Sequence, residues 1–214
     1  MNKVKVTKEV VVFKKYSTVV EGHISEELED GKVVSYTREK IVRPDAVAAL
    51  IYNIDTESVI LVNQFRYPID SEKNDGFIYE VMAGKIDPGE TPINTLKRES
   101  LEEVGYKLKN KNIIECMPAF AVPGYSTEKI YLYLVTVTNK DKIAKGGGKE
   151  GEEENIDIIE MPYLIFANQI DCFNDMKTRV LAYEAHYRKL FDIKPKKIVR
   201  KPKPNNNSNY KIKF

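Results

Sequence analysis

A chain of 214 residues is long enough for one domain with a small added module, and its 42% hydrophobic and 31% charged residues exclude wholesale disorder. The longest unbroken apolar run is Ala46–Tyr52, whereas a membrane helix needs roughly 20 apolar residues, so we expect no membrane partner. Two cysteines cannot build a disulfide framework and two histidines exclude histidine-rich metal chemistry, so we predict a cytoplasmic protein whose acid–base groups are carboxylates.

Charge is divided unevenly along the chain. Residues 192–214 contain eight Lys or Arg and one Asp, whereas the rest of the chain is mildly acidic, although the formal net charge is +2. We expect this tail to be solvated and disordered, because its KPKPNNNSN run offers almost nothing to bury. A basic tail can also attract nucleic acid, which leaves a nucleic-acid partner open as an alternative.

The first 44 residues predict a small antiparallel β module. β-Branched residues recur through the segment, the pair Asp30–Gly31 is typical of a tight turn, and residues 32–42 alternate in the manner of a strand. A sheet this small has little core of its own, so it must pack on the rest of the chain or on a second subunit.

The residues that follow predict a larger sheet with two helices. Short apolar runs bounded by turn-forming residues indicate strands, and a longer amphipathic segment at residues 174–190 indicates a helix. The predicted strands are residues 46–52, 59–65, 77–82, 113–121, 129–137 and 156–161.

The other helix, predicted over residues 91–104, has the clearest signals. Thr91 is a suitable N-cap, Pro92 suits the first turn, and Gly105 suits the position that follows the last turn. Its apolar residues fall in one arc of about 140°, which predicts the face that packs on the sheet.

Three carboxylates are expected on the opposite face of this helix. Glu99, Glu102 and Glu103 fall within five residues, and like charges one turn apart destabilise a helix by roughly a few tenths of a kcal/mol. A divalent cation would relieve that repulsion, and Mg²⁺ or Mn²⁺ prefers such oxygen ligands together with water and substrate phosphates. The alternative is a solvated acidic face with Lys97 and Arg98 as partners.

The residues around this cluster favour the cation. From Gly84 onward the chain follows the pattern G-x5-E-x7-R-E-x2-E-E-x-G, which resembles the Nudix box, the signature of hydrolases that cleave nucleoside diphosphates linked to another moiety. The matching positions are Gly84, Glu90, Arg98, Glu99, Glu102, Glu103 and Gly105. Ser100 departs from the family pattern, which usually has alanine or an aliphatic residue there.

The resemblance implies the Nudix fold, an α/β fold in which helices flank a mixed β-sheet as an α/β/α sandwich, here with the small N-terminal antiparallel β module. It implies Mg²⁺ or Mn²⁺ as the cofactor. The implied metal ligands are the carbonyl of Ala83 and the carboxylates of Glu99, Glu102 and Glu103. The implied structural positions are Gly84, Glu90, Arg98 and Gly105, with Glu90 and Arg98 as a pair that holds the loop to the helix.

Flanking segments resemble the ADP-ribose pyrophosphatase branch of this family. They are Gln64–Pro68, Glu80–Glu90, Pro123–Glu128 and Asp175–Thr178. The resemblance implies that Arg66, whose planar guanidinium suits phosphate oxygens, contacts the substrate, and that Gly124 and Glu128 lie on a loop near it. The alternatives are a surface cation at a strand end and a plain turn.

The implied reaction is hydrolysis of the pyrophosphate of a nucleotide sugar, ADP-ribose, to AMP and ribose 5-phosphate. Another nucleoside diphosphate derivative such as GDP-mannose is the nearest alternative substrate. A Nudix module that senses ADP-ribose or a nucleotide without cleaving it is the alternative from a different class.

The acidic loop at residues 145–155 supplies the candidate general base. A loop glutamate activates the attacking water in this branch, and the resemblance points to Glu154, with Glu152 and Glu153 as rivals. Glu102 is also a catalytic candidate, because it would ligate or support the metals. The alternative is a solvated linker.

The same branch is typically a homodimer whose N-terminal strands exchange between subunits, which agrees with the thin β module. We therefore predict three parts. Residues 1–44 form a β module for dimerisation, residues 45–191 form the Nudix hydrolase domain, and residues 192–214 form the basic tail.

Overall fold

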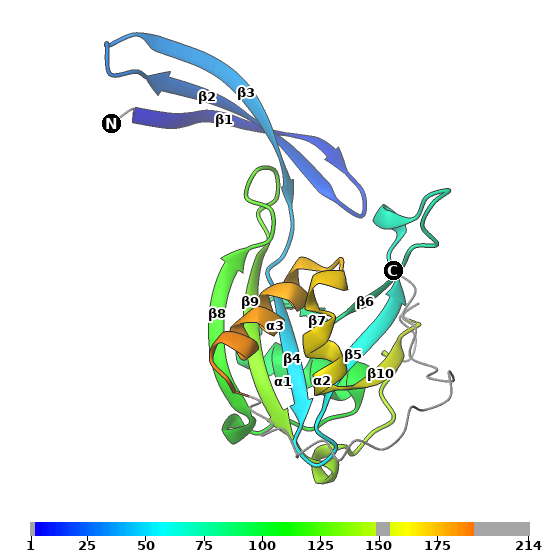
Figure 1. The fold of residues 1–214 in the computed structure, drawn as a ribbon. Helices are drawn as coiled ribbons and strands as arrows, with labels where there is room; N and C mark the ends of the chain where they lie inside the picture. Colours follow the sequence, from blue (N-terminus) through cyan, green and yellow to red (C-terminus); the bar gives the residue numbers. More distant parts are fainter. Residues whose placement is uncertain (1–2, 149–154, 191–214) are drawn as a thin grey trace.

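Two β-sheets organise the computed structural model, which describes residues 3–148 and 155–190 (Figure 1). The smaller sheet is antiparallel, in the order β1 (Lys3–Lys14), β2 (Thr18–Glu27), β3 (Val33–Val42), and the predicted β module is confirmed. It extends away from the main body, and β3 leads directly into β4. The end of β3 is fixed to the main body because Ile41 N–H donates to the carbonyl of Tyr125, at 2.7 Å, and Thr127 N–H donates to the carbonyl of Ile41.

The larger sheet is mixed, as the sequence predicts. Its strands are β4 (Ala46–Asn53), β5 (Ser58–Phe65), β6 (Phe77–Glu80), β7 (Met82–Lys85), β8 (Ile113–Phe120), β9 (Lys129–Val137) and β10 (Asp157–Pro162). The main path runs β10-β5-β4-β9-β8, while β6 pairs with β5 and β7 pairs with β4. Strands β4 and β9 are parallel, and the other pairs are antiparallel.

The predicted strand at residues 77–82 is two strands in the structure. Strands β4 and β5 pair over only three residues each, Ile51–Asn53 with Ser58–Ile60, and then separate. The chain enters this gap along β5 as β6, crosses over at Val81, and leaves along β4 as β7. A residue of the last helix fixes this crossing, because Val81 N–H donates to Thr178 Oγ1 at 2.9 Å. Divergence of the two strands lets β6 and β7 enter the sheet, and β7 carries Ala83 and Gly84.

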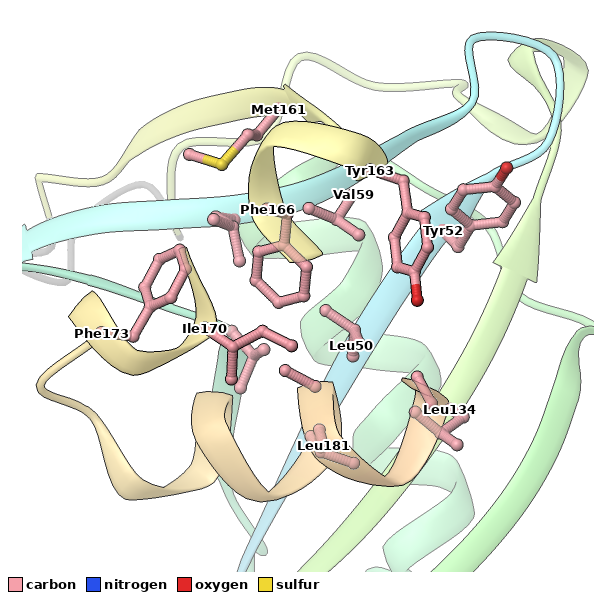
Figure 2. Packing of buried hydrophobic residues seen from close by; sticks show 14 of the residues in the cluster. Leu50, Tyr52, Val59, Leu134, Met161, Tyr163, Phe166, Ile170, Phe173 and Leu181 are labelled. Carbon is pink, nitrogen blue, oxygen red and sulfur yellow. The ribbon is translucent and has the colours of Figure 1, made fainter. Parts of the chain in front are cut away.

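Helices cover both faces of the larger sheet, so the predicted α/β/α arrangement is confirmed. Alternate residues of β4 point to opposite faces. Ile51 packs with α1 (Pro92–Val104), and Leu50 packs with α2 (Tyr163–Asn168) and α3 (Met176–Tyr187). Figure 2 shows the second cluster, in which aromatic side chains of α2 and the following turn meet Leu50 and Leu181. The short 3₁₀ helices are η1 (Tyr67–Ile69), η2 (Asn110–Asn112), η3 (Asn139–Asp141) and η4 (Ile170–Cys172).

Local signals place the ends of the helices. Thr91 accepts a hydrogen bond from Asn94 N–H and begins α1, and Gly105 ends it in the left-handed region at φ 80°. Helix α3 is shorter than the predicted 174–190, because Asp175 caps it at the N-terminus and it ends at Tyr187. No helix in the described parts of the chain is both long and apolar enough to cross a bilayer.

Candidate active site

The buried face of α1 differs from the face that its apolar residues predict. The buried residues are Thr95, Leu96, Glu99, Ser100, Glu103 and Val104. Glu99 and Glu103 are only 8% and 3% exposed, while Glu102 is partly buried. The expectation that all three carboxylates share a face opposite the packed one is therefore wrong. Glu99 and Glu103 turn toward strand β7, where a backbone donor and a glycine accommodate them.

Strand β7 receives these two carboxylates through its backbone. Ala83 N–H donates to Glu103 Oε2 at 3.3 Å. In a strand, the N–H and C=O of one residue point to the same side, so the Ala83 carbonyl is also directed away from its partner Ala48 on β4. A Cβ atom at Gly84 would lie 1.9 Å from Glu99 Cδ, so only glycine lets that carboxylate lie against the strand.

Arg98 joins the carboxylates of α1 to the loop that precedes the helix. Its Nε and Nη2 donate to the two carboxylate oxygens of Glu90 at 3.2 and 2.9 Å, and Nη2 also donates to the carbonyl of Lys85. Its Nη1 donates to Glu99 Oε1 at 2.7 Å and to Glu102 Oε2 at 3.1 Å. One guanidinium thus fixes the relative position of three acidic side chains.

These contacts shift the ionisation of the pair. The hydrogen bonds from Arg98, with a further one from the Thr95 hydroxyl at 2.7 Å, lower the pKa of Glu90 from its ordinary 4.5 to about 2. The Glu90 carboxylate in turn raises the pKa of Arg98. Both groups are therefore charged at neutral pH, and the loop between β7 and α1 is held at its two ends.

A cleft of about 440 Å³ lies over this arrangement. Its lining draws on helix α1 and strand β7, on Arg66, which directly follows β5, and on Lys177 of α3. Its lining includes the predicted residues Arg66, Ala83, Gly84, Arg98, Glu99, Glu102, Glu103 and Glu128, and adds Tyr16, Arg43 and Lys177. Gly124 is not among the residues that line it. A larger cleft of about 590 Å³ near residues 69–79 contains none of those predicted site residues that the structure describes.

A model of the NUDIX domain family matches residues 42–167, which include every one of the α1 carboxylates. This chain belongs to the NUDIX family. Nudix hydrolases generally use divalent metal ions.

Relatives of known name agree with this assignment. The GDP-mannose pyrophosphatase of Cronobacter sakazakii (strain ATCC BAA-894) is 31% identical over 166 residues, which cover 76% of this chain and 84% of the relative. The GDP-mannose pyrophosphatase of Enterobacter sp. (strain 638) is 32% identical over 136 residues, covering 63% and 68%. A crystal structure of an ADP compounds hydrolase shares the fold, with a TM-score of 0.67 at 18% identity, and covers 89% of this chain and 96% of that one.

The Nudix-box residues fit a divalent cation in donor chemistry. Three carboxylates and a backbone carbonyl are all oxygen donors, the type that Mg²⁺ and Mn²⁺ prefer. In the described residues no three acidic, histidine or cysteine side chains converge as a metal site. One nitrogen, Nη1 of Arg98, is bonded to both Glu99 and Glu102, so these two carboxylates lie close enough to contact the same cationic group.

The Nudix loop candidates Glu152, Glu153 and Glu154 lie outside the described residues. The glycines just before them are described and are bonded to the end of α1. Gly147 N–H donates to the carbonyl of Glu103 at 2.8 Å, and Gly148 N–H to that of Glu102 at 3.2 Å. The chain that leads into the acidic loop therefore starts beside the backbone of two predicted metal ligands.

Sequence reasoning assigned no role to two charged residues of this site. Glu80 is 2% exposed at the end of β6, and Lys177 of α3 lines the cleft. Both stand in segments that resemble the family, but their proximity depends on a contact between residues 97 positions apart. Local patterns contain no signal for such a contact.

Proposed function

We propose that this protein is a metal-dependent pyrophosphatase that hydrolyses the diphosphate linkage of a nucleoside diphosphate sugar. The observation that supports it most is a cleft lined both by the carboxylates of Glu99, Glu102 and Glu103 and by the cations of Arg66 and Lys177. A diphosphate needs cations to bind it, and its cleavage needs carboxylates to hold metal and to accept a proton. The names of the relatives point to the same class of substrate.

In this proposal Glu99, Glu102, Glu103 and the carbonyl of Ala83 hold the divalent cation, either Mg²⁺ or Mn²⁺. A bound cation would offset the charge that develops on the diphosphate oxygens and make water more acidic. Arg98 and Glu90 position the carboxylates, because the guanidinium bonds to Glu99 and Glu102 while its other edge is fixed by Glu90.

The reaction transfers a phosphoryl group to water. The water oxygen forms a bond to one phosphorus, the bond from that phosphorus to the bridging oxygen breaks, and the products are a nucleoside monophosphate and a sugar phosphate. Arg66 donates to phosphate oxygens, and Glu128, which also lines the cleft, contacts the substrate. Glu154 accepts the proton of the attacking water, with Glu152 and Glu153 as alternatives.

The assignment of the base is tested by single substitutions in the loop. Glu154→Gln should lower kcat by about 100-fold or more, the range expected for loss of a general base, while Glu152→Gln and Glu153→Gln retain most of the rate. The reverse result, with loss in Glu152→Gln and normal turnover in Glu154→Gln, would shift the register by two residues.

Two substrates are favoured by different observations. Segments around the Nudix box resemble the ADP-ribose branch, and the relatives compared above are named GDP-mannose pyrophosphatases. Values of kcat/KM for ADP-ribose and GDP-mannose, measured with one enzyme preparation and product chromatography, decide between them. Tight binding of either compound without any hydrolysis would instead support the sensing alternative.

The proposal includes a homodimer formed through the N-terminal sheet. Its strands expose large apolar side chains, among them Val4, Val6, Val11, Val12 and Phe13, each 46–59% exposed. A strict monomer in light scattering would contradict the dimer. We also propose that the protein is cytoplasmic. Its three parts are residues 1–44, 45–191 and 192–214. Deletion of residues 192–214 tests the tail, because loss of RNA retention with intact hydrolysis would make it a separate anchor.

A further inference from the structure

A buried carboxylate lies behind the two cations of the cleft. The side chain of Glu80 is 3% exposed, and a buried carboxylate is costly unless donors satisfy it. Its Oε1 accepts hydrogen bonds from Arg66 Nε at 2.7 Å and from Gln64 Nε2 at 3.1 Å. Its Oε2 accepts one from Lys177 Nζ at 3.0 Å. Each oxygen of one carboxylate thus holds one of the two cations.

The cations keep further donors for a ligand. Arg66 is bonded to Glu80 through Nε alone in the described parts of the chain, so its two terminal nitrogens are not used by that pair. Arg66 is 42% exposed in its side chain, and both it and Lys177 line the cleft that contains Glu99, Glu102 and Glu103. Glu80 itself is not among the lining residues, so it acts on a ligand only through the cations.

Further hydrogen bonds hold Lys177 at the start of α3. Lys177 Nζ also bonds to Asp175 Oδ1 at 2.6 Å, and the other oxygen of Asp175 accepts from the backbone and hydroxyl of Thr178. The same hydroxyl accepts from Val81 N–H, where the chain crosses between β5 and β4. The cation pair is therefore tied to the first turn of α3 and to the point at which the sheet divides.

Electrostatics support the arrangement. Burial alone would lower the pKa of Lys177, but the nearby carboxylates of Glu80 and Asp175 outweigh that effect and raise it. Burial likewise opposes the charge of Arg66, and Glu80 again outweighs it. Both cations are therefore kept charged beside Glu80, although burial opposes their charge.

We propose that Glu80 is a positioning residue that fixes Arg66 and Lys177 on its two carboxylate oxygens, so that their remaining donors face the diphosphate of the substrate. This inference rests on the proposed function. It predicts the direction in which anion affinity changes when Glu80 is neutralised. A carboxylate that only repelled the anion would, when neutralised, allow tighter binding, whereas a positioning carboxylate gives weaker binding when it is neutralised.

The experiment compares wild-type protein, Glu80→Gln, Lys177→Met and the double variant, all in Mg²⁺ buffer. Calorimetry measures the Kd of inorganic pyrophosphate, and product chromatography measures kcat/KM for ADP-ribose and GDP-mannose. Glu80→Gln keeps the shape of the side chain and should weaken pyrophosphate binding and lower kcat/KM at least about fivefold each. Because Glu80 acts through Lys177, the loss in the double variant should be smaller than the product of the single losses.

Glu160→Gln on β10 is the matched control, since Glu160 lies outside the cleft and bonds to Thr56. It should bind and turn over as wild type does. If Glu80→Gln fails to fold, as judged by its thermal transition, Arg66→Lys keeps the charge but loses the fork that reaches both Glu80 and a phosphate. It should then weaken pyrophosphate binding at least about fivefold.

Each outcome separates the two proposals. Wild-type binding of pyrophosphate with coupled loss in the variants, but no hydrolysis, would refute the proposed function and leave the positioning role standing. Hydrolysis by wild type with unchanged or tighter pyrophosphate binding in Glu80→Gln would refute the positioning role alone. Absence of pyrophosphate binding by wild type, or single losses that multiply in the double variant, would also overturn it.

Discussion

Gly84 is the residue at which a single methyl group should disturb the site most selectively. A Cβ atom there would lie 1.9 Å from Cδ and 2.2 Å from Oε1 of Glu99, and ordinary contact starts near 3.4 Å. The carboxylate must therefore retreat by about 1.5 Å, which also breaks its 2.7 Å bond to Arg98. The end of a glutamate side chain can rotate, so the cost in the free energy of unfolding should stay at about 1–3 kcal/mol.

The cost to catalysis should be larger. A displacement of about 1 Å in a catalytic group can lower the rate about 100-fold, so Gly84→Ala should lose at least that factor in kcat/KM. Its affinity for Mn²⁺, measured by calorimetry, should fall at least about tenfold, because Glu99 is a proposed ligand. Thermal unfolding would show that the variant is still folded at the assay temperature.

Gly22→Ala is the control for adding a methyl group to a strand glycine. Its new Cβ would find its nearest neighbours at 3.7 Å and 3.9 Å, which is ordinary contact, so stability and activity should be unchanged. Wild-type Mn²⁺ affinity and turnover in Gly84→Ala would refute the assignment of Glu99 as a ligand held against β7.

Three further predictions concern stability. Ser100 is fully buried and its Oγ has no hydrogen-bond partner in the described parts of the chain. Ser100→Ala should therefore raise the free energy of unfolding by about 1 kcal/mol and Tm by roughly 2–4 °C in calorimetry. A lower Tm would contradict this. The pKa of Glu90 is lowered to about 2, so its contribution, up to about 3 kcal/mol, is complete above pH 4.5 and lost as the pH falls toward 2. Wild type should therefore lose Tm more steeply than Glu90→Gln below pH 4.5, and parallel curves would disprove the link. Gly146→Ala places Cβ 2.6 Å from the carbonyl oxygen of Glu103 at φ 73°, and should cost about 1–3 kcal/mol or more in urea unfolding.

Features that depend on neighbouring residues were predictable from the sequence. Helix α1 begins and ends where its caps, Thr91 and Gly105, place it, and most strands follow from short apolar runs between turns. The Nudix box was recognisable because its residues are close together in the chain. Helix α2 has only six residues, too few for a helical period to emerge, and was not predicted.

Features that depend on distant partners were not predictable. The break at Val81 follows from a change of pairing partner, which leaves no mark on the alternation of side chains. The buried orientation of Glu99 and Glu103 requires the backbone of β7, and an apolar pattern alone counts these residues as solvated. Glu80 and Lys177 satisfy each other across the fold, and each alone is typical of a surface position.

We propose that the carboxylates of α1 support hydrolysis of a nucleoside diphosphate sugar. The most direct test offers ADP-ribose and GDP-mannose, with Mg²⁺, to wild type, Glu103→Gln and the matched control Glu160→Gln, and separates the products by chromatography. We expect AMP or GMP together with the sugar phosphate from wild type and control, and a loss of turnover of at least about 100-fold in folded Glu103→Gln. Equal turnover by folded Glu103→Gln and wild type, or no cleavage of either compound by wild type, would contradict it.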